Sequence, residues 1–575
     1  MKKALSAAIF VIVFPVFCFE IVVSSTRTDS FTVSETAFPT EFEFAAPSFG
    51  LALCRYQSGG AMFLSAPGLS SAHTNFVFKG ITLNDPATGT FDLSSFPAYL
   101  SDVFAYFPSD SSSLWGGRGI GGTVFLDLKM KDRFKADMLL EENASRFVFI
   151  APLSTGRIKM NLMYQGNEGN SKRENSGFRK NFIGAALEIG GAVTAVLNFS
   201  DERTNTPGPL VNALDPFSAT YPLDKMEASS AFFLVAADLG KTSLAAAYRR
   251  YAYTYENYYY GSLYRYGGGN SYFRMAGNAG IADGPDIKAG LKFSIRSEES
   301  GEKKNLRGGL GGMLFFKGPA LGFEGRFHLR DDAPAALAGS MHWHYMRDLH
   351  ELFLDLSRGI RQPELNDLYF PGSGNPELKE EKSVSFTVKY AYSFLSGRYS
   401  HREIEDMIAW VLDDPLLYLY SPKNIAKAVI NEAVLTAEKK AGPLKFKETF
   451  AYNWGHQERV YDPGMTCANI TRTYPATYLP DIVNTFSASL EFRGMELAAE
   501  HLYRGRMSNI YNGAVKTIGP VRVLNIMLRA PLRNSFFEIG VKNALDARGS
   551  GAPGDSFYDG DYPIAGRTFY ARLSI

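Results

Sequence analysis

From about residue 133 onward, apolar and polar residues alternate along the chain in segments that are separated by Gly, Pro, Asn or Asp. The segment after Pro319 shows the pattern most clearly, because apolar residues or Gly stand at every odd position from 321 to 329 and charged or polar residues stand at 324, 326 and 328. Successive side chains of a strand point to opposite faces, so each such segment predicts a strand with one apolar and one polar face. A barrel in lipid needs such strands, and so does a soluble sandwich that buries the apolar face.

Repetition and two kinds of connection favour the barrel over the sandwich. Transmembrane barrels have short turns at one end and long polar loops at the other. The sequence predicts tight turns at residues 190–191, 239–241, 318–319 and 530–531, and long loops at residues 201–226, 255–286, 456–479 and 546–562. At ~20 residues per strand with its share of loop, the roughly 440 residues from 133 to the end predict about 22 antiparallel strands, a size that encloses a plugged lumen. The last strand should run to Ile575, since Phe569, Ala571 and Leu573 continue the alternation.

The start of the chain predicts export. Met1, Lys2 and Lys3 precede an apolar run over residues 4–17, which is typical of a secretory signal peptide, and we expect cleavage after Cys18. Beyond this segment we find no run of the ~18 apolar residues that a spanning helix requires, so a mature chain that crosses a membrane must do so as a closed barrel.

The amino-acid composition is consistent with strands in which polar and apolar residues alternate. Aromatic residues reach 14%, whereas hydrophobic residues reach 45% and the mean hydropathy is −0.12. The 60 basic and 59 acidic residues give a formal net charge of +1, which offers no reason to expect nucleic acid as a partner. Cys54 and Cys467 are the cysteines outside the signal peptide, too few for a disulfide framework.

Two glycine-rich blocks before the barrel, at residues 80–97 and 114–124, resemble the plug of TonB-dependent outer-membrane receptors. Barrel segments at residues 358–379 and 541–567 look like the family's barrel signatures. The resemblance implies an all-β membrane protein with a TonB box and plug domain over residues 19–132, lodged in the lumen of a transmembrane β-barrel over residues 133–575. The size is closest to the cobalamin-transporter branch, but the plug is shorter than the family usually shows.

The same resemblance implies a monomer in the bacterial outer membrane, embedded in its lipid. It would take up a scarce small-molecule nutrient, such as cobalamin, siderophore-bound iron or a similar complex, with energy from a TonB-like protein in the periplasm. The alternative is a passive porin, or a ligand-binding or adhesin barrel, with a vestigial plug. The plug blocks favour the receptor, since an open porin has no use for about a hundred residues before its first strand. No nucleophile, base and orienting group stand together, so we expect no enzymatic activity.

The resemblance also implies where partners bind. A TonB box is expected at the mature amino terminus, where it would add as an edge strand to the periplasmic partner; it comprises Glu20, Ile21, Val22, Val23 and Ser24. A mobile terminus that contains β-branched residues by chance remains the alternative.

Ligand contacts are expected from Asn84, Asp85 and Thr88 in the plug, although Asp85 and Pro86 also suit an ordinary turn. Further contacts are expected from a tyrosine-rich loop; its candidates are Tyr258, Tyr259 and Tyr260, which could equally form an interfacial girdle. His342 and His344 would share a strand face, and we interpret them as a lumen-facing pair. Neither a metal nor a cofactor is expected.

Overall fold

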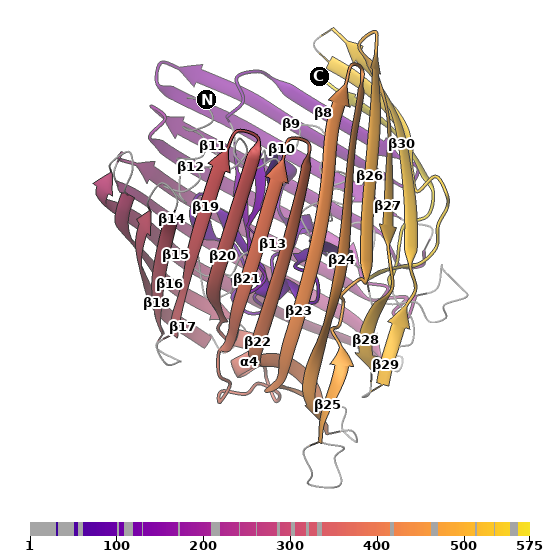
Figure 1. The fold of residues 1–575 in the computed structure, drawn as a ribbon. Coiled ribbons are helices and arrows are strands. Elements are labelled where there is room, and N and C mark those ends of the chain that lie inside the picture. The colour runs from indigo at the N-terminus through magenta and orange to yellow at the C-terminus, as the bar shows by residue number, and fades with distance from the viewer. Residues whose placement is uncertain are drawn as a thin grey trace.

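Antiparallel pairing between neighbouring strands dominates the computed structural model (Figure 1). It describes residues 30–32, 51–55, 61–100, 103–107, 119–128, 130–170, 173–208, 219–240, 242–259, 262–283, 288–300, 305–317, 321–330, 336–414, 419–461, 470–511, 514–533, 535–552 and 562–575. The predicted signal peptide, the predicted TonB box and residues 114–118 of the second plug block lie outside this part of the chain. No helix within it is long and apolar enough to span a membrane.

A closed barrel contains 23 of the described strands. Two of them share one position, because β25 pairs with residues 456–461 of β24 and β26 pairs with residues 444–452 of the same strand. The described ring therefore has 22 positions, which confirms the predicted barrel of about 22 antiparallel strands. The barrel strands are β8 (Lys135–Glu141), β9 (Ala144–Thr155), β10 (Ile158–Gly169), β11 (Phe178–Ile189), β12 (Val193–Asn205), β13 (Lys225–Asp238), β14 (Thr242–Tyr259), β15 (Ser262–Asp283), β16 (Lys288–Ser300), β17 (Asn305–Lys317), β18 (Leu321–Arg330), β19 (Ala336–Arg347), β20 (His350–Arg361), β21 (Glu381–Tyr392), β22 (Leu395–Asp414), β23 (Leu419–Ala441), β24 (Leu444–Tyr461), β25 (Ile470–Pro475), β26 (Ile482–Phe492), β27 (Met495–Arg504), β30 (Val521–Leu532), β31 (Ser535–Lys542) and β34 (Thr568–Ser574).

The last strand closes the ring as its alternation predicts. Phe569 and Ile575 are 62% and 56% exposed on the outer face, whereas Arg572 is buried on the inner face. β34 pairs with β8, and the Arg572 guanidinium donates hydrogen bonds to the Asp137 carboxylate of β8 at 2.7 and 2.9 Å. A buried ion pair therefore joins the first barrel strand to the last.

Short turns lie at one end of the barrel, which we call the periplasmic end, and the longer connections lie at the extracellular end. Turns at residues 190–192 and at residues 239–240 lie where they were predicted, and residues 241 and 318–319 are outside the described residues. The prediction of a turn at residues 530–531 is wrong, because Ala530 and Pro531 pair with β31 inside β30. A proline is tolerated at position 531 because the pairing of β30 with β27 ends at Arg529, so no partner strand on that side needs an amide from residue 531. Pro531 lies beside Gly494 of the neighbouring turn.

The predicted loop over residues 255–286 is also wrong. β14 and β15 stay paired from Thr242 with Ala279 up to Tyr259 with Ser262, so this region is a long hairpin. The tyrosine-rich sequence continues the alternation of the strands that precede and follow it, and the two strands stay paired along it. Residues 206–224 and 543–567, by contrast, do connect barrel strands at the extracellular end.

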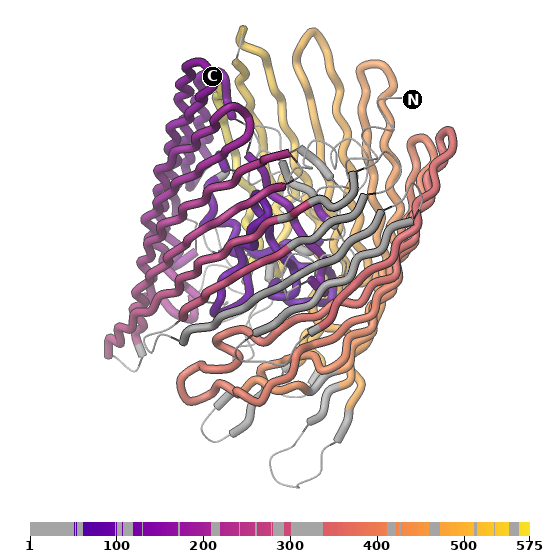
Figure 2. The backbone as a smooth tube through the Cα atoms, turned by 90° about the vertical axis from the view of Figure 1, so that its left-hand side faces the viewer, coloured from indigo at the N-terminus to yellow at the C-terminus, as the bar shows by residue number. Residues whose placement is uncertain are grey.

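The described residues before β8 lie inside the ring, as two views 90° apart both show (Figures 1 and 2). Its sheet has the order β1-β6-β7-β4-β5, in which β4 and β7 are parallel and the other neighbours are antiparallel. The proposed boundary between residues 132 and 133 falls between β7 and β8. The strands of this plug are β1 (Ser30–Thr32), β2 (Ala52–Arg55), β3 (Met62–Ser65), β4 (Asn75–Phe78), β5 (Ile81–Thr82), β6 (Val103–Phe107) and β7 (Thr123–Asp127), with 3₁₀ turns η1 (Ser71–His73), η2 (Leu93–Ser95) and η3 (Ala98–Leu100).

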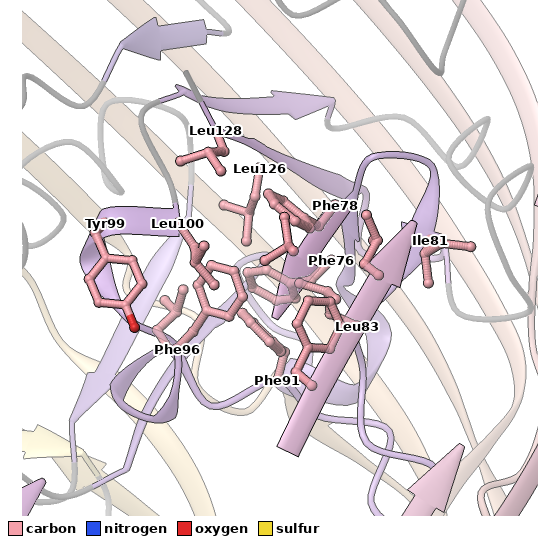
Figure 3. Close-up of a cluster of buried hydrophobic side chains, with 14 of the residues drawn as sticks. Phe76, Phe78, Ile81, Leu83, Phe91, Phe96, Tyr99, Leu100, Leu126 and Leu128 are labelled. Atoms are coloured by element: carbon pink, nitrogen blue, oxygen red, sulfur yellow. The ribbon is translucent and has the colours of Figure 1, made fainter. Parts of the chain in front are cut away.

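Phenylalanine and leucine side chains fill the centre of the plug (Figure 3). Phe76 and Phe91 are almost completely buried, with ring centroids 4.8 Å apart, and Phe91 meets Phe96 edge-on at 5.5 Å. A tight turn leads into β7, where Gly122 has a φ of 89° and a side chain at Gly121 would press on the His73 carbonyl at 3.0 Å. These glycines allow the turn to approach η1 closely.

Candidate functional site

The loop between β5 and η2, residues 84–90, forms the apex of the plug. Asn84 is fully buried and shapes the loop from within: its side-chain carbonyl accepts a hydrogen bond from the Phe76 amide, and its amide group donates to the carbonyls of Thr74 and Gly89 at 2.9 and 2.7 Å. The Asp85 carboxylate accepts the backbone amides of Ala87 and Thr88 at 2.8 and 3.1 Å, as in an Asx turn. Asp85 is half-buried and Thr88 is exposed. Of the three plug residues predicted to contact ligand, Asp85 and Thr88 lie on the loop's surface, whereas Asn84 does not.

The barrel wall holds the apex loop from one side through β15. The Asn270 side chain donates to the Asp85 carboxylate at 2.9 Å. Deeper in the lumen, Arg274 donates to the backbone carbonyls of Thr82 and Asn84 at 2.7 and 2.8 Å. Arg274 is also paired with Glu298 of β16, with Nε 3.0 Å from Oε1. The position of the apex is therefore fixed by the β15–β16 wall.

An extracellular connection, residues 362–380, holds the same loop from another side. Its short helix α4 (Leu365–Tyr369) begins with a capping box formed by Glu364 and Asp367. The first amides of α4, those of Leu365 and Asn366, donate to the carbonyls of Pro86 and Ala87 at 3.2 and 2.9 Å. Gly89 packs so closely on Glu364 that a Cβ there would lie 2.6 Å from its carboxylate. The apex loop is thus sensitive to the position of an extracellular loop.

Tyrosines of the long hairpin face the lumen above the apex. On β14, Tyr251, Tyr253 and Tyr255 share the inward parity of Ala245 and Ala247, which are 2% and 1% exposed. Tyr255 lies opposite Tyr266 of β15, with ring centroids 5.2 Å apart. Tyr253 lies over Gly268, where a Cβ would be 2.7 Å from the phenolic oxygen, so the glycine makes room for the ring. We call the inward set Tyr251, Tyr253, Tyr255, Tyr264 and Tyr266 the tyrosine wall.

Two of the tyrosines predicted as ligand contacts can be placed, and they differ from the tyrosine wall. Tyr258 has the opposite parity, so it lies on the outer face of the barrel, 42% exposed, with its backbone amide bonded to Asp224. Tyr259 pairs with Ser262 at the hairpin tip, and Tyr260 is outside the described residues. The prediction that Tyr258 faces ligand is therefore corrected. Counting parity from the small residues at 245 and 247 would have selected the inward tyrosines.

The site offers aromatic faces, phenolic hydroxyls and the Asp85 carboxylate, and Tyr264 and Tyr266 are 55% and 54% exposed. Rings of this kind stack on flat or apolar ligand surfaces, while their hydroxyls form hydrogen bonds.

His342 and His344 lie on β19 with the inward parity of Ala338 and Ser340, and His344 is 3.2 Å from Glu351. Within the described ranges, no group of three His, Cys, Asp or Glu side chains could hold a metal ion.

Comparison with known proteins supports the fold across the chain and shows sequence similarity in one part of it. No family model matches the sequence. Vitamin B12 transporter BtuB of Vibrio vulnificus is 34% identical over 104 residues, and its counterpart in Photobacterium profundum is 32% identical over 105 residues. These matches cover 17% and 16% of this chain and the same shares of the two relatives, so the similarity spans about one sixth of their length.

Solved structures match over nearly the whole length. The copper transporter OprC superposes with a TM-score of 0.73 at 14% identity, covering 92% of this chain and 93% of that one. The FrpB iron transporter of Neisseria meningitidis gives 0.73 at 11% identity with 96% and 100% coverage, and the siderophore receptor PirA of Acinetobacter baumannii gives 0.70 at 12% identity with 91% and 94% coverage. At these identities the likeness is one of fold, a large barrel shared with outer-membrane transporters and receptors.

Proposed function

We propose that this chain, which has the plugged-barrel fold of TonB-dependent receptors, is an outer-membrane receptor that binds a scarce nutrient at its extracellular end and passes it inward with energy from a TonB-like periplasmic protein. The observation that carries the proposal is the three-way contact at the plug apex. The loop of residues 84–90 is bonded at once to β15 and to the extracellular connection that bears α4, beneath the tyrosine wall. A ligand seated there touches the plug itself, so binding outside can alter the segment that blocks the lumen.

The amino-terminal geometry supports energy coupling from the periplasm. β1 is the edge strand of the plug sheet and pairs with β6 through three residue pairs. The proposed TonB box, with Val22 at its centre, precedes β1 by a few residues. A partner that adds a strand to this box would pull first on β1, which lies at one edge of the sheet.

For the ligand, we propose a bulky complex with apolar faces and hydrogen-bonding groups at its edge, and a corrinoid is the first candidate. The tyrosine wall provides ring faces and hydroxyls at several heights, which suits a large ligand better than a bare ion. The local similarity to proteins named vitamin B12 transporters points the same way. Relatives in fold are named for copper, iron and siderophores, so these are the alternatives to be tested.

The test compares two tyrosines of the same strand that lie on opposite faces. Purified protein is titrated separately with cyanocobalamin, a ferric catecholate chelate and Cu²⁺. For the compound that binds, Tyr253→Ala should weaken affinity by about tenfold, because a stacked ring is worth roughly 0.5–1.5 kcal/mol beyond its buried area and the buried area is lost as well. Tyr258→Ala removes the same side chain from the outer face and should leave affinity unchanged. Equal affinities of the two variants would show that the tyrosine wall does not contact the ligand.

A further inference from the structure

The inner wall of the barrel is apolar on one side, although a lumen wall is ordinarily polar. Inward residues of β9 to β14 belong to the same buried cluster as the plug's own core; they include Val148, Phe182, Val196, Phe232, Leu234 and Ala247. Phe78 of the plug, for example, has its ring centroid 6.4 Å from that of Phe232. We call this side the apolar wall. Plug and wall here form one hydrophobic core.

Polar ties reinforce the same contact. The Tyr99 hydroxyl donates to the Asn198 side chain of β12 at 2.6 Å, and burial raises the pKa of Tyr99, which keeps this donor protonated. Lys180 of β11 donates to the Ser94 hydroxyl at 2.7 Å. Both ties join the plug to strands of the apolar wall.

The opposite side of the lumen has a different character. Buried hydroxyls on β20 to β24 bond to one another across neighbouring strands: Ser357 with Ser385 at 2.8 Å, Thr387 with Ser400 at 3.2 Å, and Thr436 with Thr449 at 3.2 Å. We call this side the hydroxyl wall. These hydrogen bonds join neighbouring strands of the barrel.

The plug also contacts this side, nearer the extracellular end. His73 of η1 lies 2.6 Å from Glu381, the first residue of β21. A second, smaller apolar cluster joins Leu69 and Ile120 of the plug to Ile404 and Ile430 of β22 and β23. Both contacts lie above the hydroxyl wall along these strands, so the hydroxyl wall extends from them towards the periplasmic end.

We propose that the plug stays bound to the apolar wall during transport and that the passage opens between the plug and the hydroxyl wall. This inference rests on the proposed uptake function. Separating the apolar wall from the plug would expose a continuous hydrophobic surface, and the cost grows with the area exposed. Hydroxyls lose little when water or a solute replaces one partner with another. Charged side chains on the same wall, including Lys389, Arg402 and Glu432, can likewise be solvated by water when the passage opens, whereas the side chains of the apolar wall cannot.

Cysteine reactivity tests which interface opens first. The full chain is prepared with its native cysteines replaced by Ser, and Thr436→Cys or Val196→Cys is added singly, so each wall carries one thiol in place of a β-branched residue of similar size. Labelling by a charged maleimide is followed through a urea series that leaves the barrel folded, as judged by its heat-modifiable migration in SDS gels. Thr436→Cys should become reactive at lower urea than Val196→Cys and react at least tenfold faster between the two midpoints.

Coincident midpoints, earlier exposure of Val196→Cys, or no reaction at either thiol before the barrel unfolds would each overturn the inference. Ala247→Cys provides a second thiol on the apolar wall if Val196→Cys does not fold. The labelling needs neither ligand nor periplasmic partner. A failure to bind any nutrient would therefore overturn the proposed function while leaving this measurement valid, and the reverse also holds.

Discussion

Arg274 provides the sharpest test of how the barrel holds the plug. Its side chain and that of Glu298 are 6% and 0% exposed, and the guanidinium also donates to the carbonyls of Thr82 and Asn84. Arg274→Met keeps a long apolar side chain but leaves the Glu298 carboxylate buried without the guanidinium. Breaking a buried ion pair from one side costs about 3–5 kcal/mol. We expect the local stability of the plug apex to fall by that amount.

Hydrogen–deuterium exchange measures the effect directly, since amides of residues 80–90 exchange through local opening of this region. A loss of about 3 kcal/mol corresponds to exchange faster by roughly a hundredfold. The double variant Arg274→Met with Glu298→Met should be affected less, because the buried carboxylate that lost its ion pair is removed as well. Arg203→Met is the matched control: Arg203 pairs with Glu227 on the outer face, where the two side chains are 69% and 56% exposed, and such pairs contribute at most about 1 kcal/mol. Exchange within threefold of wild type in Arg274→Met, or a double variant as damaged as the single one, would refute the clamp.

Two further predictions concern the apex loop and the amino terminus. Gly89→Ala should loosen the contact with residues 362–380, because the new Cβ meets Glu364; faster proteolysis of that connection and a weaker ligand affinity are the readouts. Gly156→Ala is its control, since Gly156 also has a positive φ, 57°, but has nothing within 4 Å of a Cβ, and equal effects would mean that backbone strain alone is responsible. Val22→Pro should abolish energised uptake while surface binding persists, because proline removes an amide donor from the added strand; Val22→Ile should transport normally, and uptake that continues in Val22→Pro cells would count against coupling through this segment.

Much of the barrel could be predicted because the alternation of period two is strong and repeated. β18 (Leu321–Arg330) begins and ends within a residue of the alternating segment that predicted it, and the inward and outward faces of β34 follow the predicted parity. The ends of the long hairpin could not be predicted in the same way. Alternation of polar and aromatic residues continues from β14 into the tip near Tyr259, and nothing in that pattern marks where lipid ends and water begins.

The site was predicted less well because parity was not followed through the tyrosine-rich segment. Tyr258, which was expected to contact ligand, lies on the outer face of the barrel, whereas Tyr253, which was not singled out, lies on the inner face. The role of Asn84 also depends on contacts that sequence does not contain, since its three hydrogen bonds reach backbone groups of residues 74, 76 and 89. Such a polar side chain near a turn looks the same whether it binds ligand or the loop itself.

The apolar wall, by contrast, did leave a signal. Residues 231–237 and 244–247 are continuous apolar runs without alternation, which is typical of strands that are buried on both faces. In a lipid-embedded barrel the outer face is always apolar, so such a run means that the inner face also meets something apolar. Runs of this kind on neighbouring strands could therefore have located the side of the lumen to which the plug is bound.

The difference between the two walls bears on how much work the proposed periplasmic partner would have to do. A pull on the amino terminus acts first on β1, which is held by three residue pairs at the edge of the sheet. The next strands, β6 and β7, contribute Tyr106, Val124 and Leu126 to the hydrophobic core shared with the apolar wall. We therefore expect that a smaller force removes β1 than extracts the core of the plug, because extracting the core would expose its apolar surface to water. A receptor built this way can open one side of its lumen by partial rearrangement of the plug, in which β1 and the His73–Glu381 contact separate while the shared core stays packed.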